Sequence, residues 1–316
     1  MITAAQKRKR MFLPIFSLVA AATAALAPLP AAAQDAPASS DIVAPQVPEG
    51  SVGGMGDINL YPKRVVIDRR QRIASIGLYN RTIDPGEYEI SVMDMVMSPT
   101  GEVFQLDNLP SDVPTDRLRT ASDFLRWSPR RVRLLGSEAQ TVRIMARPPA
   151  DLPDGEYRSH FLAVSVPQDI DEGFSINEAV NGGETTGPDI GVTIRPRFGI
   201  SIPVIVRVGE TTLDVSLDSG FVETPEGLAI AVTISRSGTR SAFGDLIVTA
   251  PGVDEPVAIA RGVGVYPEID SRQIMLGLNK DFDTSLLTPG TTLTVTYIDD
   301  DFAPGETLAS SNFSVP

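Results

Sequence analysis

The stretch of sequence that decides the fold runs from Pro188 to Arg207. It reads Pro-Asp-Ile-Gly-Val-Thr-Ile-Arg-Pro-Arg-Phe-Gly-Ile-Ser-Ile-Pro-Val-Ile-Val-Arg. Apolar residues recur at alternate positions along it: Ile190, Val192, Ile194, Phe198, Ile200, Ile202, Val204 and Val206. Because the side chains of a strand alternate between its two faces, this row predicts a long extended segment with one apolar side.

A single domain rarely needs a strand of this length with one apolar side. Such a strand is typical of a protein that lends a strand to a partner whose own sheet is incomplete. The alternative is an ordinary core strand inside a two-domain structural or adhesive surface protein. Pro196 and Pro203 lack a backbone N–H, so pairing at these positions is expected to be one-sided or bulged.

The N-terminus predicts export. Basic residues 7–10 precede the apolar run 11–29, and Ala31-Ala32-Ala33 is a cleavage pattern, so residues 1–33 read as a signal peptide. An uncleaved membrane anchor is the alternative, but the apolar run is short for a bilayer span. Residues 34–56 are rich in Ala, Pro, Ser and Gly and predict a flexible linker.

The composition of the chain excludes some classes of partner and some kinds of metal and catalytic site. The chain carries 27 Lys+Arg against 40 Asp+Glu, a formal net charge of −13, and loss of the four basic residues of the signal peptide makes it −17. This excess of negative charge argues against nucleic acid as a partner. The chain has no cysteine and one histidine, which excludes thiolate metal sites, cysteine nucleophiles and multi-histidine metal sites.

Short alternating runs separated by turn signals predict two β-sandwich domains, over residues 57–207 and 208–316. The expected strands of the first are 58–67, 72–79, 88–97, 102–106, 126–134, 139–146, 156–166 and 190–206. Those of the second are 211–217, 228–234, 244–249, 257–265, 272–278 and 291–297. Tyr157 follows the turn Leu152-Pro-Asp-Gly155 and is expected to form a tyrosine corner, in which its hydroxyl bonds back to the nearby backbone.

No constellation of catalytic residues is recognisable, so we expect a protein that is not an enzyme and needs no cofactor; a secreted hydrolase is the weakest alternative. His160 and Ser159 are neighbours on one strand, face opposite sides and cannot pair with each other, so a structural histidine is expected. Asp299–Asp301, with Asp281 and Asp283, could supply oxygen ligands to calcium, but a solvated acidic turn is the expected interpretation.

Five motifs together resemble the first domain of PapD-like periplasmic pilus chaperones, in particular the branch that is associated with spore-coat-U-type pilin subunits. The resemblance covers roughly residues 57–207. The motifs are Pro62-Lys-Arg64, Ile76-Gly-Leu-Tyr-Asn80, Trp127-Ser-Pro-Arg-Arg-Val-Arg-Leu134, Ser137-Glu-Ala-Gln-Thr-Val-Arg-Ile144 and Leu152-Pro-Asp-Gly-Glu-Tyr-Arg-Ser-His160.

The resemblance implies two immunoglobulin-like sandwiches in a boomerang arrangement and a chaperone that acts by donor-strand complementation. In that family the last strand of the first domain completes a pilin-like subunit that lacks a strand, and an outer-membrane usher receives the subunit for surface assembly. The expected subunit-binding residues are Ile190, Val192, Ile194, Phe198, Ile200, Ile202 and Val204. We expect that Ile200→Asp or Ile202→Asp abolishes subunit stabilisation while the chain still folds.

The resemblance also implies an anchor for the C-terminal carboxylate of the subunit. Arg64 matches the first-strand arginine of that anchor, whereas the position of the lysine that completes it falls near Pro203. Arg195, Arg197 and Arg207 are the candidates to replace this lysine. Without a subunit, a homodimer that covers the apolar strand is one possible state, and the sequence leaves the choice between monomer and dimer open.

Overall fold

The structure is a computed structural model of the 316-residue chain, and it describes residues 52–53, 57–111, 113–167, 197–225 and 227–316. The predicted signal peptide and most of the predicted linker lie outside the described residues. Within the described residues strands predominate, and the helices are three short 3-10 turns, Leu106–Asn108, Ser122–Phe124 and Thr284–Leu286. No described helix is long and apolar enough to cross a bilayer.

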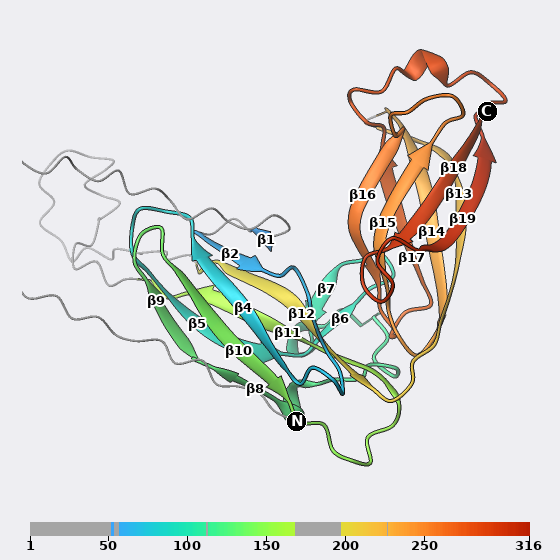
Figure 1. Cartoon of the computed structure of the whole chain (residues 1–316). Coiled ribbons are helices and arrows are strands. Elements are labelled where there is room, and N and C mark those ends of the chain that lie inside the picture. The colour runs from blue at the N-terminus through green and yellow to red at the C-terminus, as the bar shows by residue number, and fades with distance from the viewer. Residues whose placement is uncertain (1–51, 54–56, 112, 168–196, 226) are drawn as a thin grey trace, which may run out of the picture. The chain divides into compact units, whose positions relative to one another are not determined.

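The first sandwich has two five-stranded sheets (Figure 1). One sheet has the order β1-β2-β4-β10-β8, with β1 Val52–Gly53, β2 Ile58–Tyr61, β4 Ile73–Asn80, β10 Ala139–Ala146 and β8 Leu125–Ser128. The other has the order β3-β12-β11-β5-β9, with β3 Val65–Ile67, β12 Gly199–Val208, β11 Gly155–Ser165, β5 Gly86–Met93 and β9 Arg131–Leu134. A separate hairpin pairs β6 Met95–Met97 with β7 Val103–Gln105.

The second sandwich has a three-stranded and a four-stranded sheet. The first of these has the order β13-β14-β17, with β13 Leu213–Thr224, β14 Gly227–Gly238 and β17 Ser271–Gly277. The second has the order β16-β15-β18-β19, with β16 Ala258–Val265, β15 Ala242–Thr249, β18 Thr292–Asp299 and β19 Thr307–Ser314. The prediction of two β-sandwiches is therefore confirmed.

Two strands that the sequence predicts as continuous are divided at proline. The predicted strand 58–67 breaks at Pro62 into β2 and β3, which belong to different sheets, and the predicted strand 126–134 breaks at Pro129 into β8 and β9, also in different sheets. Proline has no N–H for the ladder, so a chain that switches sheets can do so there without losing a backbone bond. The first switch places Arg64 immediately before β3.

Each sandwich encloses one apolar cluster of buried residues. The first contains Phe161, Ile202 and Tyr157, and the tyrosine corner is confirmed because the hydroxyl of Tyr157 donates to the carbonyl of Pro153 at 2.9 Å. The second cluster includes Ile205 of the first sandwich and Met97 of the β6–β7 hairpin, and the partly buried Val66 of β3 packs against it. Strand β12 therefore contributes to both clusters, with Ile202 on one face and Ile205 on the other.

Candidate functional site

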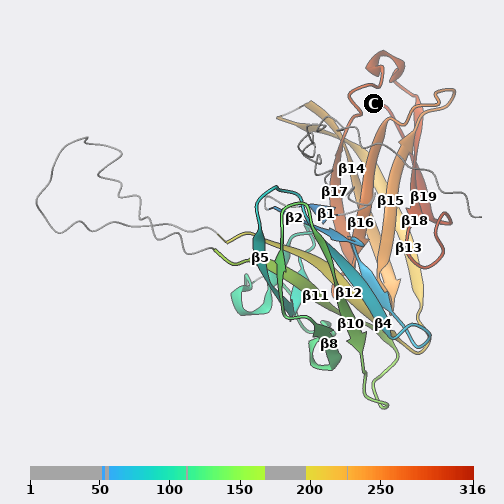
Figure 2. The same ribbon diagram turned by 60° about the vertical axis from the view of Figure 1, so that its left-hand side comes forward.

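Strand β12 is paired along the whole of one edge and along only part of the other. It pairs with β11 from Gly199, opposite Val164, to Val208, opposite Gly155, with no register shift; the two strands run side by side in both views (Figures 1 and 2). On the other edge β3 pairs only with Val204–Val206. Among the described strands, none pairs with this edge between Gly199 and Pro203, a segment that we call the open edge.

The ladder with β11 determines which backbone groups face the open edge. The amide of Ser165 donates to the carbonyl of Phe198 at 2.8 Å, which makes these two residues a hydrogen-bonded pair. Such pairs alternate in an antiparallel ladder, so the even-numbered residues of β12 bond to β11 and the odd-numbered ones point away from it. The N–H and C=O groups of Gly199 and Ser201, and the C=O of Pro203, therefore face the open edge. Pro203 has no N–H, so it presents only a carbonyl to the open edge, in agreement with the one-sided pairing predicted there.

The side chains of the predicted apolar row divide into two groups. Ile200, Ile202 and Val204 are 7%, 0% and 0% exposed and belong to the apolar cluster of their own sandwich. They have almost no surface to offer a partner, so we do not retain them as side-chain contacts. The expectation that Ile202→Asp leaves the chain folded is wrong, because an ionised carboxylate at this position would be buried without a partner.

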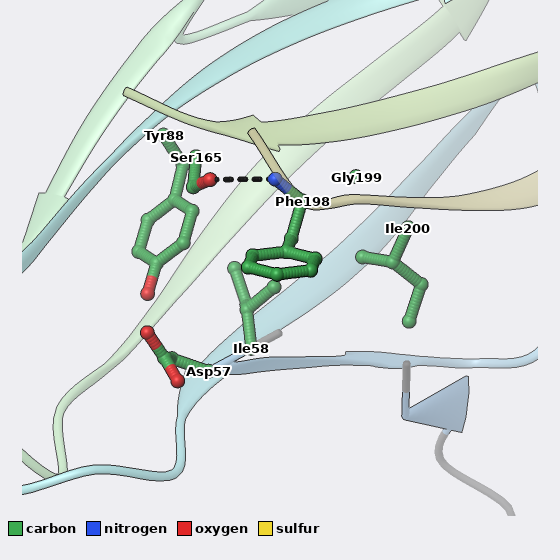
Figure 3. A pocket seen from close by; sticks show the side chains of 7 residues that line it. All are labelled: Asp57, Ile58, Tyr88, Ser165, Phe198, Gly199 and Ile200. Carbon is green, nitrogen blue, oxygen red and sulfur yellow. Dashed lines mark hydrogen bonds between the residues drawn. The ribbon is translucent and has the colours of Figure 1, made fainter. Parts of the chain in front are cut away.

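Phe198 is the described member of the row that reaches solvent, with 41% of its surface exposed. Ile190, Val192 and Ile194 lie outside the described residues. The amide of Phe198 donates to Oγ of Ser165 at 3.0 Å, which fixes the backbone where β12 begins. The ring lies beside Ile58 and Ile200 at the rim of a pocket of about 20 Å³, room for about one water molecule (Figure 3).

Two polar side chains lie at the other end of this pocket. Figure 3 shows the Tyr88 hydroxyl and the Asp57 carboxylate near each other, away from the ring of Phe198. Burial raises the pKa of Tyr88, and the negative charge of Asp57 raises it further. The tyrosine therefore stays a neutral hydroxyl, and the pocket pairs an apolar rim with a polar end.

Arg64 lies at the other end of the open edge from Phe198. Val65 is in parallel register with Val204, so the preceding residue, Arg64, falls next to Pro203. The side chain of Arg64 is 7% exposed, and its Nη2 lies 3.2 Å from Oδ2 of Asp301 and 3.4 Å from Oγ of Ser241. Its Nε and Nη1 are buried and have no hydrogen-bond partner among the described residues.

Arg207 shares the carboxylate that Arg64 contacts. Its Nη2 donates to Oδ2 of Asp301, and its Nε lies 3.2 Å from Oε2 of Glu156. Burial alone would lower the pKa of Arg207, but the carboxylates of Glu156 and Asp301 outweigh it and raise the pKa. Arg207 is thus paired with two carboxylates, whereas Arg64 retains two nitrogens that donate to no described group.

The acidic run that includes Asp301 has a structural explanation. The carboxylate of Asp299 accepts the amides of Asp301, Phe302 and Ala303 at 2.8, 3.2 and 3.0 Å, which fixes the loop after β18. Asp300 pairs with Lys63 at 2.8 Å. No cluster of metal-ligating side chains occurs among the described residues, so the calcium alternative gains no support. The run positions one carboxylate, that of Asp301, against two arginines.

A cleft of about 770 Å³ adjoins this cluster. Its lining includes Arg64, Arg69, Arg70, Arg207, Asp301 and Phe302. The cleft is large enough to admit the end of a polypeptide, and its lining combines the four arginines with the carboxylates of Asp68, Glu210, Asp300 and Asp301. Arg64 was expected at this site, whereas Glu156 and Ser241 were not, and Asp301 was expected only as part of an acidic turn or a calcium site. Only the run of three aspartates marked Asp301 in the sequence.

Arg197, another arginine proposed for the anchor, does not lie beside Arg64. Arg197 is exposed, pairs with Glu89 at 3.1 Å and donates to the carbonyl of Ser165 at 3.2 Å. It lies six residues before Pro203, which along an extended strand is about 20 Å. Arg195 lies outside the described residues. Of the three candidates to replace the lysine, the structure places Arg207 beside Arg64.

His160 is buried among charged groups of both sandwiches. It is 4% exposed, and its Nε2 lies 3.5 Å from Nη1 of Arg158, which pairs with Glu268. Burial lowers the pKa of His160 well below its ordinary value of 6.5, and the positive charge of Arg158 lowers it further. Ser159 bonds instead to Asp94 and to the amide of Ala121. These contacts agree with a structural histidine that does not pair with Ser159.

No family model matches the sequence, and no curated protein matches it. Similar solved structures include the YadV chaperone, at 12% identity and TM-score 0.40, covering 82% of this chain and 100% of that chain. The Pseudomonas aeruginosa CupB2 chaperone matches at 14% identity and TM-score 0.37, covering 80% of this chain and 97% of that chain. A chain of the CsuC–CsuE chaperone–tip adhesion subunit complex of Acinetobacter baumannii matches at 10% identity and TM-score 0.41, covering 82% and 99%.

Proposed function

We propose that this protein is a periplasmic chaperone that stabilises pilin-like subunits by donor-strand complementation and delivers them for surface assembly. The observation that carries the proposal is the open edge of β12, residues 199–203. An apolar sequence row continues past its beginning, and an incompletely paired arginine lies at its end. This is the arrangement that a strand of a partner would need in order to pair and terminate there.

The open edge supplies the backbone part of the binding. Gly199 and Ser201 each present an N–H and a C=O, and Pro203 presents a C=O. A partner strand that pairs here gains backbone hydrogen bonds, each worth about 1 kcal/mol net. It would also cover an edge that otherwise invites aggregation.

The apolar row supplies the side-chain part. Phe198 is exposed in the structure, and Ile190, Val192 and Ile194 continue its alternation along the sequence. In our proposal these four side chains fill the groove that a missing strand leaves in the subunit. Full burial of such a side chain contributes roughly 2 kcal/mol. The buried Ile202 and Val204 keep β12 within its own sandwich. The same strand can then contribute side chains to its own core and, through the preceding row, to the subunit.

Arg64 supplies the terminal contact. A subunit strand on the open edge that ends beside Pro203 brings its terminal carboxylate to Arg64. Nε and Nη1 share no edge of the guanidinium, so either one can donate to one carboxylate oxygen, and a buried donor without an acceptor costs about 1–3 kcal/mol. Both nitrogens are covered by protein, so Arg64 would shift towards the cleft to bind. Arg207 donates to the same oxygen of Asp301 as Arg64 does, so Arg64 shares this acceptor with Arg207.

The remaining parts of the proposal concern location and partners. The signal-peptide pattern of residues 1–33 supports export to the periplasm, and an outer-membrane usher would receive the loaded subunit. A second copy of the chain would cover the open edge when no subunit is bound. No nucleic acid, metal or cofactor takes part.

Co-purification tests the proposal. The tagged full chain is produced in a bacterium that encodes it, recovered from the periplasm, and its bound proteins are identified by mass spectrometry. We expect a small β-rich subunit that becomes degraded or insoluble when the chaperone is absent. A structural or adhesive surface protein, the alternative function, would instead be recovered without such a protein, and most of it would lie at the cell surface.

Two matched variants then test the open edge itself. Ser201→Pro removes an N–H that faces the open edge and leaves the bonds to β11 intact, whereas Ser201→Ala keeps that N–H. We expect at least about a fivefold loss of co-purified subunit with Ser201→Pro, which corresponds to about 1 kcal/mol, and normal recovery with Ser201→Ala. Equal recovery with both variants would argue against strand addition at this edge.

A further inference from the structure

The guanidinium of Arg64 is held mainly by residues of the second sandwich. The ring of Phe243, on β15, faces it with a distance of 4.1 Å from the ring centroid to Cζ. Asp301 and Ser241 contact its Nη2. The aromatic face and the carboxylate act on different parts of the group, because Asp301 accepts a hydrogen bond and the ring does not.

This difference decides which donors remain for a ligand. A cation–π contact attracts the positive charge through the face of the ring. Guanidinium N–H groups lie in the guanidinium plane, so a face-on contact leaves them available for hydrogen bonds. In the structure, Nη2 is engaged by Asp301, whereas Nε and Nη1 donate to no described group.

We infer that Phe243 is a positioning residue for carboxylate binding at Arg64. This inference rests on the proposed function, because it concerns the anchor of the same site. While Arg64 shifts towards the cleft, contact with the ring keeps its charge beside the open edge and leaves Nε or Nη1 to donate to one carboxylate oxygen of a ligand. Without the ring, Arg64 is free to turn both of its terminal nitrogens towards Asp301, its nearest carboxylate.

The surroundings of Phe243 show how the ring reaches this position. Phe243 is 7% exposed and lies against Gly262 and Gly264 of the neighbouring strand β16. A Cβ at Gly264 would meet the ring at 3.4 Å, and one at Gly262 would meet it at 3.6 Å. Lys63 lies near the same ring, with Nζ 5.5 Å from the centroid, and pairs with Asp300. Two cations that adjoin the open edge thus share one aromatic side chain.

The test compares a free carboxylate with a neutral group of the same size. The probe is a fluorescent peptide of alternating valine and threonine, made with a C-terminal carboxylate or with a C-terminal carboxamide. Binding of each to the mature chain is followed by anisotropy. We expect the wild type to bind the acid about tenfold more tightly than the amide, as for a charge-assisted hydrogen bond. Phe243→Leu should reduce this preference to about twofold.

Controls separate a positioning role from a structural one. Arg64→Ala should remove the preference altogether. If Phe243→Leu lowers the melting temperature, Phe243→Met serves as a second variant without a ring. Equal weakening of both peptides by either variant, or an unchanged preference, would overturn the inference and leave the proposed anchor intact. A wild type without any preference for the acid would overturn the anchor, and the inference with it.

Discussion

Arg64 and Arg207 converge on one carboxylate oxygen, Oδ2 of Asp301, although Arg64 lies in the bend before β3 and Arg207 lies on β12. Asp301 belongs to the loop after β18 of the second sandwich. The side chains of Arg64, Arg207 and Asp301 are 7%, 10% and 5% exposed. Asp301 is therefore the carboxylate that pairs with Arg64 among the described residues, whereas Arg207 also pairs with Glu156. Its contacts join the sandwiches at the end of the open edge.

Asp301→Asn should lower the free energy of unfolding by about 3 kcal/mol, because removal of one partner leaves buried charge without compensation. Equilibrium unfolding in urea measures the change. Asp300→Asn is the matched control, since its contact with Lys63 joins side chains that are 42% and 37% exposed. An exposed pair contributes less than about 1 kcal/mol. Equal losses in the two variants would show that Asp301 has no special role.

A charge in the apolar row should have unequal effects on stability at Ile202 and at Phe198. Ile202→Asp buries a carboxylate in the core, and we expect a loss of more than about 4 kcal/mol and an unfolded chain. Phe198→Asp changes a side chain that is 41% exposed, so the melting temperature should stay nearly unchanged. Circular dichroism separates the two variants, and only Phe198→Asp is expected to remain folded while it loses its subunit. A folded Ile202→Asp variant would contradict the assignment of Ile202 to the core.

Stability should fall on mild acidification because of His160. Burial and Arg158 hold the pKa of this imidazole well below 6.5 in the folded chain. The unfolded chain takes up the proton near pH 6.5, so below that pH the unfolded state binds more protons than the folded state. The free energy of unfolding should therefore decrease as the pH falls from about 6.5 towards about 5, by at most about 1.4 kcal/mol per pH unit.

Urea unfolding of wild type and His160→Gln at several pH values isolates this contribution. The variant should lose the part of the slope that belongs to the imidazole, while the slope that arises from carboxylates stays. Arg158 and Glu268, the charged groups beside His160, are present in both proteins. Identical slopes in the two proteins would show that the imidazole does not titrate as proposed.

The alternation of apolar residues predicted the strands well where one face is buried. Both sandwiches, the tyrosine corner at Tyr157 and most strand positions could be predicted in this way. Strand β19 was missed because Thr307–Ser314 contains few apolar residues, and a pattern of period two has little signal there. The breaks at Pro62 and Pro129 were missed because periodicity alone does not show that a chain changes sheets.

The candidate site was only partly predictable, for a reason of geometry. Periodicity identifies one face of β12, but both its own core and a partner's groove require an apolar face. Burial shows that Ile202 is a core residue, whereas Phe198 is 41% exposed. Likewise, Arg64 could be selected from a motif, but Asp301 and Phe243 come from distant positions in the sequence. Only the packing of the two sandwiches brings them to Arg64.

The most direct test of the account is hydrogen exchange at the amide of Ser201, measured by NMR on the free chain and on the complex with its subunit. We expect the amide of Ser201 to exchange fast in the free monomer, because this amide faces the open edge, and to be strongly protected in the complex. The amide of Ile202, which faces β11, should be protected in both. Protection of Ser201 in the free monomer equal to that of Ile202, or no gain of protection on binding, would contradict strand addition at β12.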